Sequence, residues 1–142
     1  MSDKIIVGSL EVCDLPILAI EKLHIRVDTG AATSSLHVDN IEEFSQEGDA
    51  WVRFDIHPDF HDVKKVVRRE AKIQDIRNVK SSSGDKQKRY VIETDIVLGE
   101  QRWPIQISLS DRSSMTYLML LGRQAMNGHL IVDPEQEYVL GE

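Results

Sequence analysis

Hydrophobic and polar residues alternate along much of the chain, as they do in β-strands that bury one face. The pattern is clearest on either side of Gly99-Glu100, where alternate positions of residues 90–98 and 103–109 are apolar except for Thr94. Because a glycine-containing turn joins these two stretches, they predict a β-hairpin. Residues 51–56 alternate in the same way after a polar turn at 46–49, and predict another strand.

Shorter apolar stretches predict further strands nearer the two ends of the chain. We expect a helical turn over 122–126 because the sequence Asn127-Gly128 is typical of a helix end. A turn is expected at Asp39-Asn40. The expected strands cover residues 5–12, the stretch that leads into Asp28, 117–121, 130–132 and 138–140. Seven or more short strands with polar turns and one short helix indicate an all-β barrel or sandwich, and 142 residues suit a single domain, 1–142.

Composition narrows the class of protein. The apolar fraction of 41% and the net charge of −7 are typical of a soluble globular protein and argue against nucleic acid as a partner. No apolar run approaches the roughly 18 residues of a membrane span, and the N-terminus lacks the features of a signal peptide. The single cysteine, Cys13, suits a reducing compartment and is expected to be a small buried residue. We therefore expect a cytoplasmic protein without a membrane partner.

The stretch with the clearest candidate chemistry begins at Asp28. The alternation of residues 25–27 predicts a strand that runs directly into Asp28-Thr29-Gly30, followed by Ala31 and Ala32. An Asp side chain accepts hydrogen bonds from nearby backbone amides, and glycine adopts backbone angles closed to other residues. The simplest interpretation is a turn that closes a hairpin. Two further features favour a functional site: the chain resumes as a strand at 36–38, and a distant apolar run ends in Gly122-Arg123 before a short helix.

The chain resembles the retropepsin-like aspartic proteases in three features: an apolar strand, the Asp-Thr-Gly-Ala that follows it, and a later apolar-apolar-Gly-Arg. The chain is most similar to the bacterial family labelled "ATP-dependent zinc protease", whose pattern Val-Asp-Thr-Gly-Ala-x-Thr-Ser-Ser-Leu-His is reproduced at residues 27–37. Further blocks resemble that family at 51–54, 82–84, 121–123 and 132–134, so the resemblance covers nearly the whole chain. It implies an all-β fold: a closed acid-protease barrel with one short C-terminal helix.

The resemblance also implies an aspartic-type endopeptidase. Such an enzyme needs two carboxylates close enough to share one proton, and this chain has one Asp-Thr-Gly. The second carboxylate is then expected from Asp28 of another copy, in a homodimer. The resemblance assigns catalytic roles to Asp28, Thr29 and Gly30. It assigns structural support of the site to Ala31, Gly122 and Arg123.

Some positions depart from the family pattern of retroviral members. Ala32 stands where these carry an acidic residue that holds the conserved arginine, so Arg123 needs another partner. The loop over 80–89 occupies the place of the flap but lacks its glycine-rich apolar tip. We expect a substrate rim at Ser83, Gly84, Lys86 and Arg89.

The resemblance also suggests a substrate, because family members are often associated with a ligase that adds glutamates to a protein. An acidic, glutamate-rich peptide would suit the basic clusters in this sequence, if these rim the cleft. The clusters are Lys64, Lys65, Arg68 and Arg69, and Lys80, Lys86, Lys88 and Arg89.

Two alternatives remain open. The first is a non-catalytic barrel that binds peptide, since one chain supplies half of a dyad. The second is a zinc protease, but only His57 and His61 have ligand-like spacing, and Pro58 between them disfavours a helix. Neither a phosphate-binding loop nor a nucleophile motif around Ser34 or Ser113 is present. We therefore expect no metal and no cofactor.

Overall fold

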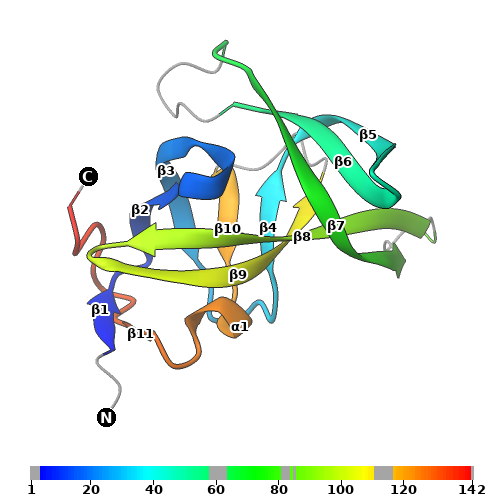
Figure 1. Ribbon diagram of the computed structural model, residues 1–142. Coiled ribbons are helices and arrows are strands. Elements are labelled where there is room, and N and C mark those ends of the chain that lie inside the picture. Colours follow the sequence, from blue (N-terminus) through cyan, green and yellow to red (C-terminus); the bar gives the residue numbers. More distant parts are fainter. Residues whose placement is uncertain (1–3, 58–63, 81–83, 85, 111–116, 142) are drawn as a thin grey trace.

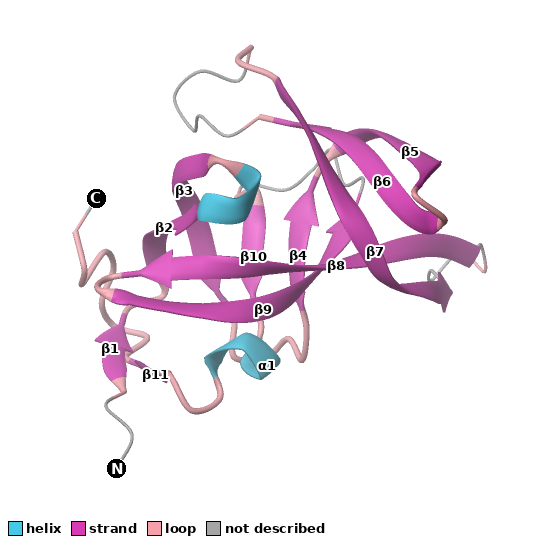
Figure 2. Ribbon diagram, in the orientation of Figure 1, coloured by secondary structure: helices cyan, strands magenta, loops and turns pink. Residues whose placement is uncertain are grey.

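The structure is a computed structural model that describes residues 4–57, 64–80, 84, 86–110 and 117–141. Strands dominate this part of the chain, and its helices are two short turns (Figures 1 and 2). None of these described helices is long and apolar enough to cross a membrane. The elements are β1 (Ile5–Val7), β2 (Leu10–Leu15), η1 (Pro16–Leu18), β3 (Ile20–Val27), β4 (Ser34–His37), β5 (Asp39–Gln46), β6 (Asp49–Ile56), β7 (Val67–Lys80), β8 (Lys86–Leu98), β9 (Gln101–Ser110), β10 (Met119–Leu121), α1 (Arg123–Met126) and β11 (Leu130–Val132).

Six strands close into a barrel in the order β2, β3, β10, β4, β9 and β8. The barrel closes because β8 also pairs with β2, where Asp14 lies opposite Val97. β10 runs parallel to β3 and antiparallel to β4, so it lies between the two strands that flank the Asp28 loop. The predicted all-β fold, a closed barrel with one short α-helix near the C-terminus, is therefore confirmed.

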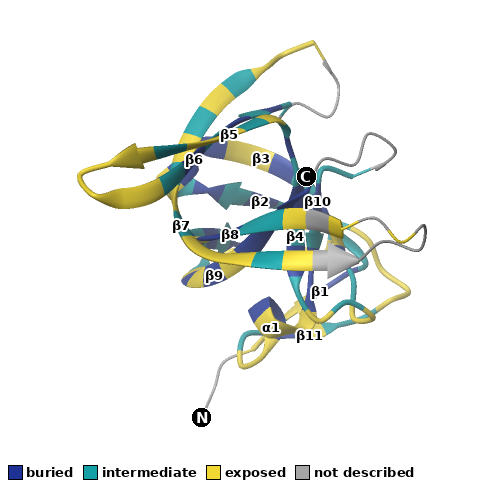
Figure 3. Cartoon of the chain, turned by 90° about the vertical axis from the view of Figure 1, so that its right-hand side faces the viewer, coloured by how far each residue is buried: buried dark blue, intermediate teal, exposed yellow. Residues whose placement is uncertain are grey.

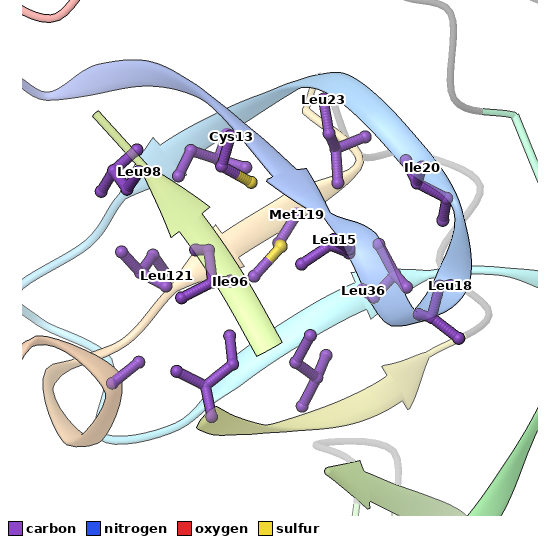
Figure 4. Packing of buried hydrophobic residues seen from close by; sticks show 14 of the residues in the cluster. Cys13, Leu15, Leu18, Ile20, Leu23, Leu36, Ile96, Leu98, Met119 and Leu121 are labelled. Atoms are coloured by element: carbon purple, nitrogen blue, oxygen red, sulfur yellow. The ribbon is translucent and has the colours of Figure 1, made fainter. Parts of the chain in front are cut away.

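The barrel interior is filled by the apolar side of the alternating strands. Leu15, Leu23, Leu36 and Ile96 are fully buried and converge from β2, β3, β4 and β8 (Figure 4). Cys13 lies in the same core with 2% of its surface exposed. Burial raises the pKa of its thiol, with a smaller contribution from the neighbouring Asp14. The expectation that Cys13 is a small buried residue is therefore confirmed.

A second layer of strands extends beyond the barrel through the long strand β7. Residues 67–72 of β7 pair with β6, whereas residues 73–80 pair with β8, with a register shift between Ile73 and Asp75. β5 and β6 complete this outer layer, and β5 is its edge strand. Exposed residues are frequent along β5 and β7 (Figure 3), whereas Val52, Phe54 and Ile56 of β6 are fully buried and join the core.

Three details of the predicted strands are wrong. The single strand expected over 5–12 is interrupted at Gly8, where a Cβ atom would collide with the backbone of Gln136. The turn expected at Asp39-Asn40 is the start of β5, and Asn40 adopts the left-handed conformation (φ 53°) beside a shift in the strand register. Residues 138–140 form no strand. Long-range packing, which local patterns do not report, determines the outcome at Gly8 and 138–140.

The C-terminal segment is attached to the barrel by a buried carboxylate. Glu11 on β2 is completely buried and accepts hydrogen bonds from three backbone N–H groups, those of Gly8 (2.8 Å), Val139 (3.0 Å) and Leu140 (3.2 Å). The side chain of Glu11 thus ties two segments near opposite ends of the sequence to the same strand.

We expect Glu11→Ala to lower the free energy of unfolding by about 3 kcal/mol or more, because it leaves these three N–H donors without their acceptor. Urea denaturation measures the change. Glu21→Ala is the control, since Glu21 is exposed and its loss should cost less than about 0.5 kcal/mol. Equal stability of the two variants would show that the carboxylate does not hold the C-terminal segment.

Candidate functional site

Asp28 directly follows β3 at the edge of the barrel where β3 and β10 both end. The two strands are parallel, with Val27 opposite Leu121, so their carboxyl ends meet. The backbone N–H of Asp28 donates to the carbonyl of Leu121 (2.9 Å). Asp28 and Gly122 are far apart in the sequence. Each is the first residue after its strand, so the fold brings them to adjacent strand ends.

The carboxylate of Asp28 is oriented by its own loop. The side-chain Oδ1 of Asp28 accepts a hydrogen bond from the Gly30 N–H (2.9 Å). The backbone carbonyl of Asp28 accepts one from the Ala31 N–H (3.2 Å). A Cβ atom at Gly30 would lie 3.2 Å from Oδ1, so glycine is the residue that fits best here. Asp28 is half-buried, and Thr29 and Gly30 are exposed. The loop thus holds a carboxylate in a fixed position that remains partly open to solvent.

Gly122 packs against the chain that leaves this loop. A Cβ atom at Gly122 would lie 2.5 Å from the carbonyl carbon and oxygen of Thr33, which no side chain tolerates. The Gly122 N–H donates to Oγ of Ser34 (3.0 Å), and the carbonyl of Ser34 accepts a hydrogen bond from Ser108 Oγ (3.2 Å). Ser34 is 1% exposed. This buried serine links β4, β9 and the Gly122 crossing, which fixes the base of the loop.

Sequence reasoning considered Ser34 only as a nucleophile and missed this supporting role. The available signal was a small polar residue at a position whose alternation with Leu36 places it on the buried face of β4. A buried hydroxyl needs a hydrogen-bonding partner, and the nearby backbone crossing supplies one.

Arg123 holds the loop from the helix side. Its backbone N–H donates to the Ala31 carbonyl (2.8 Å), and Nη1 of its guanidinium donates to the carbonyl of Thr29 (2.8 Å). Because Ala32 has no carboxylate to offer, the backbone carbonyl of Thr29 is the partner of the Arg123 guanidinium instead. Arg123 thus contacts the loop at both Thr29 and Ala31.

Thr29 faces a cleft of about 310 Å³ beside the loop. The other residues that line the cleft come from α1, from β11, from the segment between them and from the position before β1. They are Lys4, Arg123, Met126, Asn127, Gly128, Leu130 and Val132. The cleft thus joins the Asp28 loop to the elements near both chain ends.

Three of the residues expected to form a substrate rim, Gly84, Lys86 and Arg89, lie at the end of the β7–β8 hairpin or on β8 beside it. Gly84 and Lys86 are exposed there, and Arg89 is half-buried. Ser83 lies outside the described residues. The structure thus places Gly84, Lys86 and Arg89 on an arm formed by two long strands rather than in the Asp28 loop.

The two basic clusters are partly engaged within the chain. Arg68 pairs with Asp55 (3.0 Å), Arg69 donates to the carbonyl of Leu18 (2.6 Å), and Lys88 lies 3.8 Å from a carboxylate oxygen of Glu43. Hydrogen bonds from Asn40 and Arg68 hold the pKa of Asp55 below its usual value. These three cations already have partners within the chain, so the clusters do not act as wholly unpaired basic patches.

No group of three or more His, Cys, Asp or Glu residues that could hold a metal ion occurs in the described part of the chain. Nε2 of His57, just after β6, donates a hydrogen bond to Oδ2 of Asp39 (2.9 Å), the first residue of β5. His61, the other half of the weak ligand pair, lies outside the described residues.

A closed β-barrel with Asp-Thr-Gly beside a parallel strand end and a glycine crossing defines a retropepsin-like domain. The RimB-like family, described as "Retropepsin-like aspartic endopeptidase RimB", matches residues 6–142. The chain belongs to this family.

The chain is also similar to curated proteins and to a solved structure. Proteins named "Probable alpha-L-glutamate ligase" from Shewanella pealeana and Parasynechococcus marenigrum are each 48% identical over all of this chain. The chain spans only 31% and 30% of their lengths. A Legionella pneumophila protein of unknown function (DUF785) has a crystal structure with a TM-score of 0.80 and 28% identity, over 97% of this chain and 99% of that one.

Proposed function

We propose that the chain is an aspartic endopeptidase whose active site is completed by Asp28 of a second copy. The observation that carries the proposal is the Asp28 loop: a half-buried carboxylate fixed by the Gly30 N–H, beside a backbone crossing too tight for any residue but Gly122. Membership of the RimB-like family supports the same chemistry.

The chemistry needs two carboxylates that share one proton. The ionised carboxylate takes a proton from a water molecule, and the water oxygen attacks the carbonyl carbon of the scissile peptide bond. The protonated carboxyl donates a hydrogen bond to the carbonyl oxygen. A proton is then delivered to the amide nitrogen as the C–N bond breaks, so that an acid and an amine leave. The sequence contains one Asp-Thr-Gly, which is why a twofold dimer supplies both groups.

Each residue of the motif has a distinct role in this proposal. Asp28 is the catalytic carboxylate, and Gly30 orients it through its N–H group. Thr29 is exposed next to Asp28, where its hydroxyl can donate to the facing loop of the second copy. Ala31, Gly122 and Arg123 hold the loop in place from within the same chain.

The proposed substrate is a peptide rich in α-linked glutamate. Relatives that contain an equivalent of this chain are named as glutamate ligases, and the chain accounts for less than a third of each. A peptidase that hydrolyses the product of such a ligase would reverse or trim the added glutamates. Exposed Lys86, with Gly84 and Arg89 on the same hairpin and Ser83 next to Gly84 in the sequence, would then form the rim that meets the acidic substrate.

A panel of peptides tests this function. We expect cleavage of peptides that end in oligo-α-glutamate, and about 5-fold slower cleavage of the same peptides with glutamine in place of glutamate, because an exposed ion pair contributes up to about 1 kcal/mol. Product masses identify the bond that breaks.

The same assay tests the metal-independent mechanism. A chelator should not change the rate, since the two carboxylates act directly on water. Loss of activity with chelator and recovery with added zinc would contradict the proposal. Binding of oligoglutamate without any cleavage would favour the non-catalytic peptide-binding module.

A further inference from the structure

The turn between α1 and β11 contains a pair of residues with chemistry of its own, Asn127-Gly128. The backbone nitrogen that follows an asparagine can attack the side-chain amide of that asparagine. A glycine at the next position favours this reaction, because it has no side chain to obstruct the attack and lets the peptide unit rotate. The sequence contains three asparagines, and only Asn127 precedes a glycine. Asn127 is therefore the asparagine whose neighbour favours deamidation.

The fold leaves this turn open. Asn127 and Gly128 are exposed, and a Cβ atom at Gly128 would meet nothing within 4 Å beyond its chain neighbours. Asn127 has left the helical conformation (φ −57°, ψ 124°), and Gly128 has a φ of 84°. Within the described residues, neither the Asn127 side chain nor the Gly128 N–H makes a hydrogen bond. In this part of the chain, no hydrogen bond therefore holds the attacking nitrogen or the amide in place.

The other two asparagines are held in strands. Asn40 on β5 donates from Nδ2 to Oδ2 of Asp55 (2.8 Å), and Asn78 lies on β7 where this strand pairs with β8. Each precedes a β-branched residue, and such a residue crowds the attacking nitrogen. The two positions are therefore internal controls for the reactivity of Asn127.

We propose that Asn127 is a site of spontaneous deamidation, which forms a carboxylate and, in part, a longer backbone beside the Thr29 cleft. The Gly128 nitrogen loses its proton and bonds to Cγ of Asn127, the bond from Cγ to the side-chain nitrogen breaks, and ammonia leaves. The cyclic imide then takes up one water. Opening at one carbonyl gives aspartate, and opening at the other gives isoaspartate, whose backbone runs through Cβ and Cγ. Water enters and ammonia leaves, so the reaction needs neither a second copy nor peptidase activity.

Deamidation adds a negative charge to the cleft that contains Thr29. Asn127 lines this cleft together with Lys4 and Arg123. Arg123 lies one helical turn before Asn127, the spacing at which side chains meet. Its Nη1 donates to the carbonyl of Thr29 (2.8 Å). A carboxylate at position 127 therefore competes with this carbonyl for the guanidinium, since ionised acceptors form the stronger hydrogen bonds.

Isoaspartate has a further effect, because it lengthens the backbone within a closely bonded turn. The His129 N–H donates to the Met126 carbonyl (2.9 Å) across the turn, and the His129 carbonyl accepts from the Ile5 N–H (3.0 Å) at the start of β1. The His129 ring stacks on Trp103 of β9, with the centroids 4.4 Å apart and 10° between the planes. One extra methylene between Met126 and His129 shifts the residue that joins these contacts. We therefore expect β1 to be held less firmly.

Peptide mapping of the full chain, aged in mildly alkaline buffer, tests the modification. We expect the peptide that contains residue 127 to gain about 1 Da and to separate into two products, as deamidation to aspartate and isoaspartate requires. Peptides with Asn40 and Asn78 should keep their mass. Asn127→Gln is the matched control, since it keeps the amide but would have to close a larger, less favoured ring, and its mass should not change.

Two results of this mapping would overturn the proposal. The first is an unchanged mass at residue 127 in the folded chain when the same chain unfolded in urea gains the mass, because the fold would then protect the turn. The second is an equal rate of change at all three asparagines.

Amide hydrogen exchange tests the consequence for β1. In the aged wild-type chain we expect exchange at the Ile5 N–H to be about 5- to 10-fold faster than in the fresh chain, the effect of weakening one backbone hydrogen bond. Aged Asn127→Gln and fresh Asn127→Asp, which has the charge without the extra methylene, should keep the slow exchange. Equally fast exchange in Asn127→Asp would overturn the role of the longer backbone. Slow exchange in the deamidated chain would overturn the link between the turn and β1.

Discussion

Asp28→Asn is expected to abolish peptide cleavage without changing the fold. The Oδ1 of asparagine can accept the same hydrogen bond from the Gly30 N–H, so the loop keeps its shape. The amide can neither take a proton from water nor share an acidic proton with a second carboxyl group. A positioned acid–base group contributes about 100- to 10,000-fold to the rate, and both copies lose theirs in this variant.

The rate of cleavage of an oligo-α-glutamate peptide measures this loss, with circular dichroism and the midpoint of urea unfolding as checks on the fold. Asp95→Asn is the matched control. Asp95 pairs with Arg102 (2.8 Å) in the β8–β9 hairpin, and loss of one partly exposed ion pair costs little stability. Full activity of the Asp28→Asn protein would place the catalytic carboxylate elsewhere in the chain.

The strands that were predicted best are those in which apolar and polar residues alternate regularly. The strands around Gly99-Glu100 are β8 and β9, and their predicted inward residues, such as Ile92, Ile96 and Ile107, are fully buried. The turn before β6 also lies where it was expected. Such strands bury one face along their length, so the pattern of side chains alone determines which face is inside.

The architecture that joins distant segments could not be read from local patterns. The break at Gly8 depends on Gln136, and the C-terminal segment is held by Glu11 on β2. The division of β7 between two partner strands is likewise set by which residues of β6 and β8 lie beside it. In each case the determining contact lies far away in the sequence.

Part of the candidate site could be predicted from the sequence. The motif at 28–30 and the distant Gly122-Arg123 were identified together, and the structure brings them to adjacent strand ends. The partners of Arg68 and Lys88 were not predictable, since Asp55 and Glu43 lie on other strands of the outer layer. Charge clusters in a sequence therefore overstate how many cations remain for a ligand.

Mixed dimers provide the second prediction with a large effect. A dimer of one wild-type and one Asp28→Asn chain has one carboxylate and one amide at the shared site, so it should be nearly inactive. With random exchange of chains, an equal mixture contains about a quarter wild-type dimers. Each chain carries a net charge of −7, so the exchange is best carried out at about 0.15 M salt, which screens the repulsion between copies.

The activity of this equal mixture tests the central claim most directly. At constant total chain concentration, a site shared between two copies predicts about a quarter of the wild-type rate. It also predicts that the rate per wild-type chain falls on dilution below the dimer dissociation constant. A mixture that retains about half of the wild-type rate, with no dependence on dilution, would show that one chain acts alone and would contradict a dyad built from two copies of Asp28.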